Sequence, residues 1–507
     1  MTGTSDIERL RHRRTPIEMG GETFRALGYA MVDRIAEFLD TLPGRKVFPG
    51  KEPAEVRDAL GCGSLPEMGT DPAALLARTA DLMFENSLYN GHPRFWGYIT
   101  SSAAPVGALG DLLAAAVNPN LGGWILSPMA CEIELQTVRW VAELIGFPAG
   151  CGGILTSGGN MANFVGFWAG RRAKTGWDVR REGYAGRSER HRVYASRETH
   201  TWVQKAADLS GLGTDAIRWV ETDASFRMDA AALRAAIESD REAGWIPLIL
   251  IGTAGSVSTG AVDPLSELAV IAREHDMWFH VDGAYGAPAA VVPGVAPGFA
   301  GLDLADSVAV DPHKWLYAPI EAGCTLVRGP GHLRDTFGYR PAYYPPENPD
   351  DGAPVMFFEL GPQNTRGFRA LKVWLGLQQA GREGYAAMIA DDIALARALY
   401  DFADADPRLE AVTHGLSVTT FRYVPEGVDP GTPGGERYLN ELNQAIEESL
   451  QKEGEAYLTH AVLDDRFVLR ACVVNFRTAL ADIEALPGIV KRHGAVLDRI
   501  LRPGAPG

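Results

Sequence analysis

The sequence contains little cysteine. Only five cysteines occur among 507 residues, and no two of them form a C-x-x-C pair. A disulfide framework needs more cysteines in a shorter chain, and a structural zinc site needs them in closely spaced pairs. We therefore predict neither disulfides nor a bound metal, and we expect a reducing compartment, the cytoplasm.

Long apolar runs and an excess of positive charge are also absent. The opening segment has no apolar core of the signal-peptide kind, and no uninterrupted apolar stretch is long enough to span a bilayer. The 48 basic residues are outnumbered by 64 acidic ones, which gives a net charge of −16. This balance argues against nucleic acid or an anionic membrane as the main partner.

Three regions differ in their apolar pattern, and we predict a domain from each. Residues 1–90 show helical spacing and are expected to form a helical segment that packs on a partner subunit, although packing on the same chain is an equal alternative. Residues 91–388 alternate short apolar runs with helical stretches, and residues 389–507 are typical of a small α+β domain. The alternation predicts an α/β fold whose sheet is mainly parallel and covered on both faces.

Two of the expected helices begin at an Asp. Asp229 precedes an alanine-rich helical stretch and is a good N-cap. Asp263 precedes Pro264, and we expect the carboxylate to cap a helix whose first residue is the proline.

Four expected strands end in residues that are uncommon at such positions. These are the pair Gly158–Gly159, His200, Asp282 and Lys314. The carboxyl ends of strands in an open parallel sheet face the crevice where ligands bind. Each residue also has an ordinary interpretation, as a tight turn, a structural histidine, a turn cap or a solvated lysine.

Taken together, these residues are the parts needed to hold pyridoxal phosphate. Glycines let backbone N–H groups approach a phosphate at a helix start. A lysine forms a Schiff base with the cofactor aldehyde, and an aspartate pairs with the pyridine nitrogen. The segment matches neither G-x-G-x-x-G nor the P-loop, so neither a dinucleotide nor a nucleoside triphosphate is indicated.

The same motifs are similar to those of a known family. "HVDGAYG" followed by "DPHKW", with "TSGGNMANF" and "GHPRFWGYITSS" upstream, resembles the group II pyridoxal-phosphate decarboxylases. This family includes aromatic-L-amino-acid, tyrosine, histidine and glutamate decarboxylases. The resemblance covers roughly residues 20–380 and implies the fold of type I pyridoxal-phosphate enzymes, with active sites at the interface of a homodimer.

The resemblance also implies a role for each matching residue. Lys314 would bond to the cofactor, Asp282 would contact its pyridine nitrogen and His200 would stack on its ring. The expected cofactor-binding set is Gly158, Gly159, His200, Thr253, Asp282, Ala284, Asp311, His313 and Lys314. Asp311 departs from the family, which commonly has an asparagine there that donates to the phosphate.

A segment rich in Gly and Pro, residues 328–354, is typical of a mobile lid, and a solvated loop is the alternative. In the family, a lid tyrosine protonates the substrate Cα, and Tyr343 matches it best, with Tyr344 next. Related aldehyde synthases have phenylalanine there or lack the stacking histidine. The resemblance therefore implies decarboxylation to an amine and CO2. An aldehyde synthase, an aminotransferase-like activity and an inactive regulatory protein are alternatives.

For the substrate, the resemblance places Trp96, Tyr98 and Thr365 at the side-chain pocket. Aromatic residues there favour an aromatic substrate, and tyrosine, dopa, tryptophan and phenylalanine all stay open. Glutamate is less favoured because no cation is clearly dedicated to a second carboxylate, although Arg94 and Arg366 keep that alternative open.

Overall fold

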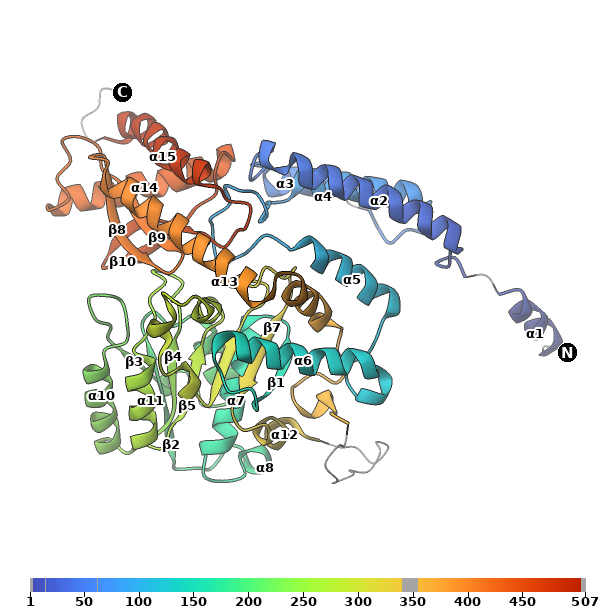
Figure 1. Cartoon of the computed structure of the whole chain (residues 1–507), viewed down its shortest axis with the longest axis horizontal. Coiled ribbons are helices and arrows are strands. Elements are labelled where there is room, and N and C mark those ends of the chain that lie inside the picture. The colour runs from blue at the N-terminus through green and yellow to red at the C-terminus, as the bar shows by residue number, and fades with distance from the viewer. Residues whose placement is uncertain (1–2, 14, 62, 340–353, 503–507) are drawn as a thin grey trace.

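The computed structural model describes residues 3–13, 15–61, 63–339 and 354–502. Figure 1 shows a body built on a large sheet, a smaller sheet with the C-terminal helices beside it, and N-terminal helices that project away from both.

The large sheet has seven strands in the order β1-β7-β6-β5-β4-β2-β3. The strands from β6 to β3 in this order pair in parallel, and β7 is antiparallel to both of its neighbours. The prediction of a mainly parallel sheet is therefore confirmed. The strands are β1 (Gly152–Thr156), β2 (Arg190–Ser196), β3 (Ile217–Val220), β4 (Trp245–Thr253), β5 (Trp278–Asp282), β6 (Ser307–Val310) and β7 (Gly323–Val327).

Helices cover both faces of this sheet, which explains why its strands are almost continuously apolar. Along β4, Leu250 packs into one apolar cluster with residues of α6, α10 and α11, whereas Ile249 and Ile251 pack into another with α7 and α9. The helices are α6 (Pro128–Ile145), α7 (Gly159–Lys174), α8 (Val179–Glu182), α9 (Trp202–Leu209), α10 (Ala230–Glu242), α11 (Leu265–Glu274) and α12 (Gly331–Phe337). Short 3-10 turns are η1 (Leu42–Gly44), η2 (Trp124–Leu126), η3 (Thr214–Ala216), η4 (Ala287–Val291), η5 (Ala296–Phe299), η6 (Leu302–Leu304) and η7 (Phe357–Glu359).

One of the two predicted caps is confirmed and the other is wrong. The Asp229 carboxylate accepts the first N–H groups of α10. Asp263 instead accepts the backbone N–H groups of Met228 and Thr253, each at 2.7 Å, and α11 begins at Leu265. Burial raises the pKa of Asp263 to about 6. The carboxylate joins the end of β4 to a distant loop, and sequence spacing does not report such a contact.

The C-terminal part has an antiparallel sheet in the order β10-β11-β9-β8. A two-residue turn, Asp464–Asp465, joins β10 to β11 with positive φ at both residues, as tight hairpins require. The strands are β8 (Leu409–Gly415), β9 (Val418–Tyr423), β10 (Thr459–Leu463) and β11 (Arg466–Cys472), packed with α14 (Pro433–Glu453) and α15 (Leu480–Leu501). Helix α13 (Arg369–Asp404) is kinked at Gly381 and passes residue 388, so the division into domains there stays a prediction.

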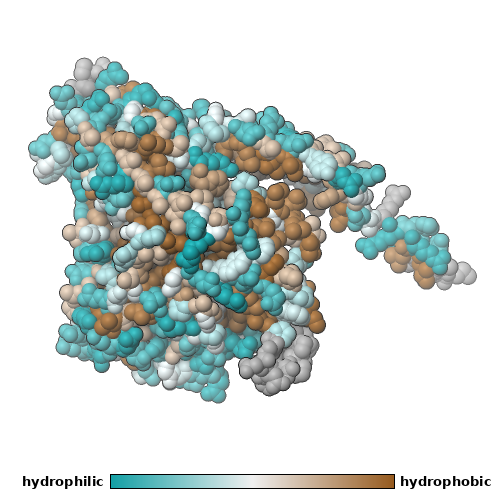
Figure 2. Space-filling model, in the orientation of Figure 1, coloured by the Kyte–Doolittle hydropathy of each residue, from teal (hydrophilic) through white to brown (hydrophobic). Residues whose placement is uncertain are grey.

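The N-terminal helices are α1 (Gly3–Arg11), α2 (Gly21–Thr41), α3 (Pro53–Leu60), α4 (Pro72–Asn86) and α5 (Pro105–Val117). Helix α2 has no buried residue and packs on α4, where Phe38 stacks on Phe84 with ring centroids 4.6 Å apart. Many apolar side chains of α2, α4 and α5 are exposed, and Figure 2 shows apolar surface along these helices. None of the helices in the described part of the chain is long and apolar enough to cross a membrane.

Candidate active site

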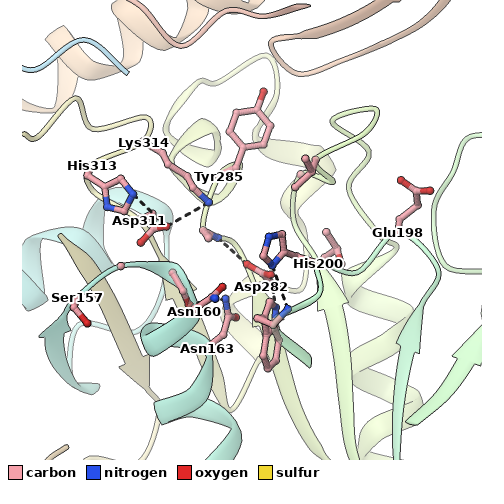
Figure 3. Close-up of a pocket in the computed structure, with 17 residues that line it drawn as sticks. Ser157, Asn160, Asn163, Glu198, His200, Asp282, Tyr285, Asp311, His313 and Lys314 are labelled. Carbon is pink, nitrogen blue, oxygen red and sulfur yellow. Dashed lines mark hydrogen bonds and ion pairs between the residues drawn. The ribbon is translucent and has the colours of Figure 1, made fainter. Parts of the chain in front are cut away.

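A cavity of about 320 Å³ opens at the carboxyl ends of the central strands. Strands β1, β4, β5 and β6 all end at this edge of the sheet, so the residues that follow them converge although they are far apart in the sequence. Figure 3 shows their side chains around the cavity. The structure brings together all nine residues of the predicted cofactor-binding set: Gly158, Gly159, His200, Thr253, Asp282, Ala284, Asp311, His313 and Lys314.

The Asp282 carboxylate is held by two donors from its own chain. Its Oδ1 accepts the backbone N–H of Ala284 at 3.1 Å, and its Oδ2 accepts the indole N–H of Trp202 at 2.7 Å. Asp282 is the last residue of β5 and is only 8% exposed. These two hydrogen bonds fix the orientation of the carboxylate, which lines the cavity.

The His200 imidazole is open to the cavity and has a defined tautomer. Its Nδ1 accepts the backbone N–H of Trp202 at 3.2 Å, so in the neutral ring the proton is on Nε2. Desolvation lowers the pKa of His200 below its ordinary value of 6.5, and the nearby Asp282 charge opposes this only in part. The neutral ring is therefore the main form near pH 7.

Lys314 reaches the cavity from a turn that follows β6. The backbone N–H of Lys314 donates to the carbonyl oxygen of Asp311, and its Nζ lies 3.3 Å from Asp311 Oδ2. His313 Nε2 lies 3.7 Å from the same oxygen. The other oxygen, Asp311 Oδ1, is buried without a hydrogen-bond partner in the described part of the chain. The carboxylate thus has bonding capacity left for a group inside the cavity.

Gly158 and Gly159 lie at the start of α7, as its N-cap and its first residue. Gly158 has φ of +99°, which disfavours any residue with a side chain. A Cβ added at Gly159 would lie 2.5 Å from Asp311 Oδ2, so no larger residue fits between α7 and the lysine turn. Free N–H groups at the start of a helix attract a phosphate. Ser157 and Asn160 line the same corner.

These features fit the size and chemistry of pyridoxal phosphate. An anion-binding helix start, a buried carboxylate and a lysine amine line one cavity, with the His200 imidazole beside them. The one feature that does not favour the phosphate is Asp311, whose carboxylate lies against Gly159 in the anion-binding corner.

The predicted substrate residues are not on the cavity wall. Trp96 is fully buried in the apolar core of the small sheet, where its indole N–H donates to Thr478 Oγ1 at 3.2 Å. We therefore do not carry Trp96 forward as a substrate contact. Tyr98 is 54% exposed and Thr365 is exposed as well. The proposed proton donor Tyr343 and its alternative Tyr344 lie outside the described residues.

Several cavity residues were not predicted from the sequence. Ser157 and Asn160 flank the glycine pair, and this adjacency is a signal that could have identified them. Glu198 and Trp202 flank His200 in the same way, but their roles depend on the fold. Burial raises the pKa of Glu198 above its ordinary value.

Comparison with known proteins agrees with this geometry. Residues 66–424 match the pyridoxal-dependent decarboxylase conserved domain, which is more than half of the chain. The chain belongs to the pyridoxal-dependent decarboxylase family. This decarboxylase is 33% identical over 468 residues to an aromatic-L-amino-acid decarboxylase of Bacillus atrophaeus, covering 92% of this chain and 94% of that protein.

Two further relatives bear on the reaction and the fold. A phenylacetaldehyde synthase from a Rosa hybrid cultivar is 28% identical, and the alignment covers 97% of the decarboxylase and 98% of the synthase. The crystal structure of Oryza sativa TDC with PLP and tryptamine superposes with a TM-score of 0.88 at 27% identity, covering 96% of this chain and all of that one. The chain is thus a pyridoxal-phosphate-dependent amino-acid decarboxylase with the expected α/β fold.

Proposed function

We propose that the protein decarboxylates an aromatic L-amino acid to the corresponding amine and CO2, with Lys314, Asp282 and His200 as its catalytic residues. The observation that carries the proposal is that the lysine amine, the buried carboxylate and the neutral imidazole line one cavity. When bound, pyridoxal phosphate supplies an aldehyde for imine exchange and a ring that accepts the electron pair left as the bond from Cα to the carboxylate breaks.

Residues that line the cavity are proposed to bind and orient the cofactor and the substrate. The Asp282 carboxylate, oriented by its two N–H donors, would contact the pyridine nitrogen of the bound cofactor. The N–H groups at the start of α7 bind the phosphate, next to Ser157 and Asn160. His200 would stack on the cofactor ring, and its proton on Nε2 would be available for donation to the substrate carboxylate. The Lys314 amine holds the cofactor between turnovers and displaces the product amine.

The pairing of two arginines supports an aromatic substrate over an acidic one. Arg366 is 1% exposed and makes a two-point contact with the buried Glu134, at 2.5 and 3.1 Å. Arg94 donates to Asp482 at 3.1 Å. Each guanidinium already faces a carboxylate of its own chain, so neither is dedicated to a second substrate carboxylate. The likeness to an aromatic-L-amino-acid decarboxylase points the same way.

We further propose that the enzyme acts as a homodimer with active sites at the subunit interface. Helix α2, which has no buried residue, and the exposed apolar residues of α5 support this, because a second subunit would cover them. Tyr98 and Thr365 are exposed, as expected of substrate contacts completed by a partner. The unpaired cysteines Cys131 and Cys324 support a reducing location such as the cytoplasm.

An aldehyde synthase is the second candidate, favoured by the 28% identity to the phenylacetaldehyde synthase. That reaction would consume O2 and water and would release an aldehyde, ammonia, CO2 and hydrogen peroxide. We assign Tyr343 as the residue that protonates the substrate Cα and thereby directs the reaction to the amine.

Product analysis tests both candidates. The purified enzyme with pyridoxal phosphate is incubated with each of the twenty L-amino acids and dopa, and CO2, amine, aldehyde and ammonia are measured. We expect equal yields of amine and CO2 from an aromatic substrate. Aldehyde and ammonia from the wild-type chain would establish the synthase, and turnover of glutamate alone would contradict the substrate class.

The role of Tyr343 is tested by Tyr343→Phe, with Tyr344→Phe as its matched control. We expect the first variant to divert flux from amine to aldehyde and the second to keep the wild-type products. Diversion by the control alone would place the proton donor at Tyr344.

A further inference from the structure

Trp202 contacts both residues that we assign to the cofactor ring. Its backbone N–H donates to His200 Nδ1 at 3.2 Å, and its indole N–H donates to Asp282 Oδ2 at 2.7 Å. These contacts come from a single residue at the first position of α9. Figure 3 shows Asp282 and His200, the two residues that Trp202 contacts, close together in the cavity.

The indole ring has no room to move away. Trp202 is 0% exposed and meets Phe167 and His280 edge to face, with ring centroids 6.2 and 5.5 Å apart. His280 is itself held at both nitrogens, each at 2.7 Å from an oxygen of Ser307 or Asn163. Because each neighbour of the indole is fixed, the N–H points at one position.

Asn163 extends this buried network to the other end of the cavity. Its amide oxygen contacts His280 and its amide nitrogen donates to the carbonyl oxygen of Gly159 at 2.9 Å. The indole that supports the Asp282 carboxylate is therefore packed on His280, whose partner Asn163 supports Gly159. A displacement of Trp202 would disturb the distance between the carboxylate and the start of α7.

We propose that Trp202 is a positioning residue for the cofactor, and that its indole N–H fixes the Asp282 carboxylate for contact with the pyridine nitrogen. The inference rests on the proposed role of Asp282. Each carboxylate oxygen already accepts one protein N–H, and the capacity that remains on it is directed into the cavity. A donated hydrogen bond also stabilises the ionised carboxylate, which is the form that keeps a proton on the pyridine nitrogen.

The test compares two ligands that differ only at the ring nitrogen. Full-length apoenzyme is titrated with pyridoxal phosphate and with its carbocyclic analogue, in which a C–H replaces the pyridine nitrogen. The ratio of the two dissociation constants measures how much binding depends on the nitrogen. General damage to the cavity weakens both ligands alike and leaves the ratio unchanged, so the ratio separates positioning of Asp282 from a merely structural role.

Trp202→Phe is the informative variant because it removes the indole N–H and keeps an aromatic ring and the backbone N–H to His200. We expect the preference for pyridoxal phosphate over the analogue to fall about tenfold, the effect of losing one hydrogen bond to a charged group. The visible absorbance of the loaded variant should shift as well. Trp202→Met, which also lacks the N–H, replaces this variant if Trp202→Phe does not fold.

Trp96→Phe is the matched control, since Trp96 is equally buried and donates its indole N–H to a side-chain oxygen outside the cavity. Its ratio should equal that of the wild type. Asp282→Asn tests the underlying assignment. If Asp282→Asn lowers the ratio and Trp202→Phe does not, the inference on Trp202 is overturned and the proposed role of Asp282 stands. If Asp282→Asn leaves the ratio unchanged, the proposed role of Asp282 fails.

Discussion

The cavity and the N-terminal helices differ in how far the chain itself supplies partners for their side chains. Around the cavity, polar groups such as Asp282 and His280 have partners supplied by the same chain, and Trp202 is completely buried. Helix α2 has no buried residue, and apolar side chains such as Phe24 and Ile35 are exposed at 55% and 41%.

The difference separates two kinds of dependence. The polar groups of the described cavity find their partners within one chain, whereas the N-terminal helices leave apolar side chains uncovered, as expected if a second subunit packs on them. Turnover should therefore be most sensitive to single cavity residues, and assembly should be most sensitive to α2.

The largest effect is expected at Lys314, because no other lysine lines the described cavity. Lys314→Ala removes the amine that bonds to the cofactor, so turnover should fall on the order of 10³-fold or more. Amine release and the visible absorbance of the loaded enzyme measure it. Lys174→Ala is the control, because Lys174 pairs with Asp276 outside the cavity. Appreciable turnover in Lys314→Ala would contradict the assignment.

A smaller effect is expected from placing charges on the exposed apolar face of helix α2. Phe24 and Ile35 are three helical turns apart on α2, so the double substitution Phe24→Glu with Ile35→Glu charges one face. Burying these charges should weaken the proposed dimer at least about tenfold. Light scattering across a dilution series measures the change. Leu209→Glu, at a residue that is 66% exposed on α9, is the control. An unchanged dimer would show that α2 does not form the interface.

A modest gain in cofactor affinity is expected from Asp311→Asn, which replaces a carboxylate at the expected phosphate site by an amide. The carboxylate lies against Gly159, where the phosphate is expected, and an amide would donate to that phosphate instead of repelling it. Affinity for pyridoxal phosphate should rise about fivefold, an electrostatic gain reduced by screening. Asp306→Asn, at a half-buried aspartate outside the cavity, should leave it unchanged. Weaker binding in Asp311→Asn would mean that the carboxylate contributes to the phosphate site.

The last effect is on stability and leaves turnover aside, and it concerns the residues that pack behind the lysine turn. Asp392 accepts the indole N–H of Trp315 and the hydroxyl of Tyr317, both near Lys314, and burial raises the pKa of Asp392 to about 7. The folded state then binds this proton more tightly than the unfolded state, so the contribution of Asp392 to stability declines as pH rises from about 4 to 7, by a few kcal/mol at most.

The comparison of wild type with Asp392→Asn isolates this group. Thermal unfolding between pH 5 and pH 8 should show a decline in the wild type that is reduced in the variant. Equal pH dependence in the two proteins would place the titration elsewhere. Since Trp315 and Tyr317 follow the lysine directly, this is also a test of how firmly the turn is held.

Sequence reasoning identified the parts that depend on local order along the chain. Alternating apolar runs predicted the parallel sheet, and parallel strands place their carboxyl ends at one edge, so Asp282 and Lys314 could be brought together without coordinates. The capping role of Asp229 was predicted for the same reason.

Contacts between residues that are far apart in the sequence could not be predicted. Asp263 has the spacing of a cap, but its partners are backbone groups brought close only by folding. Trp96 was predicted to line the substrate pocket, yet its side chain packs in the core of the small sheet. The contact of Trp202 with Asp282 joins residues 80 positions apart, and no local pattern encodes it.

The position of Trp202 has an optical consequence. Indole emission overlaps the absorption of a pyridoxal ring, and energy transfer between them is strongest at contact distance. Of the 11 tryptophans in the chain, Trp202 lines the cavity and donates directly to Asp282, the residue that we propose contacts the ring. Its fluorescence should be quenched as each site fills, so the protein carries its own reporter of cofactor loading.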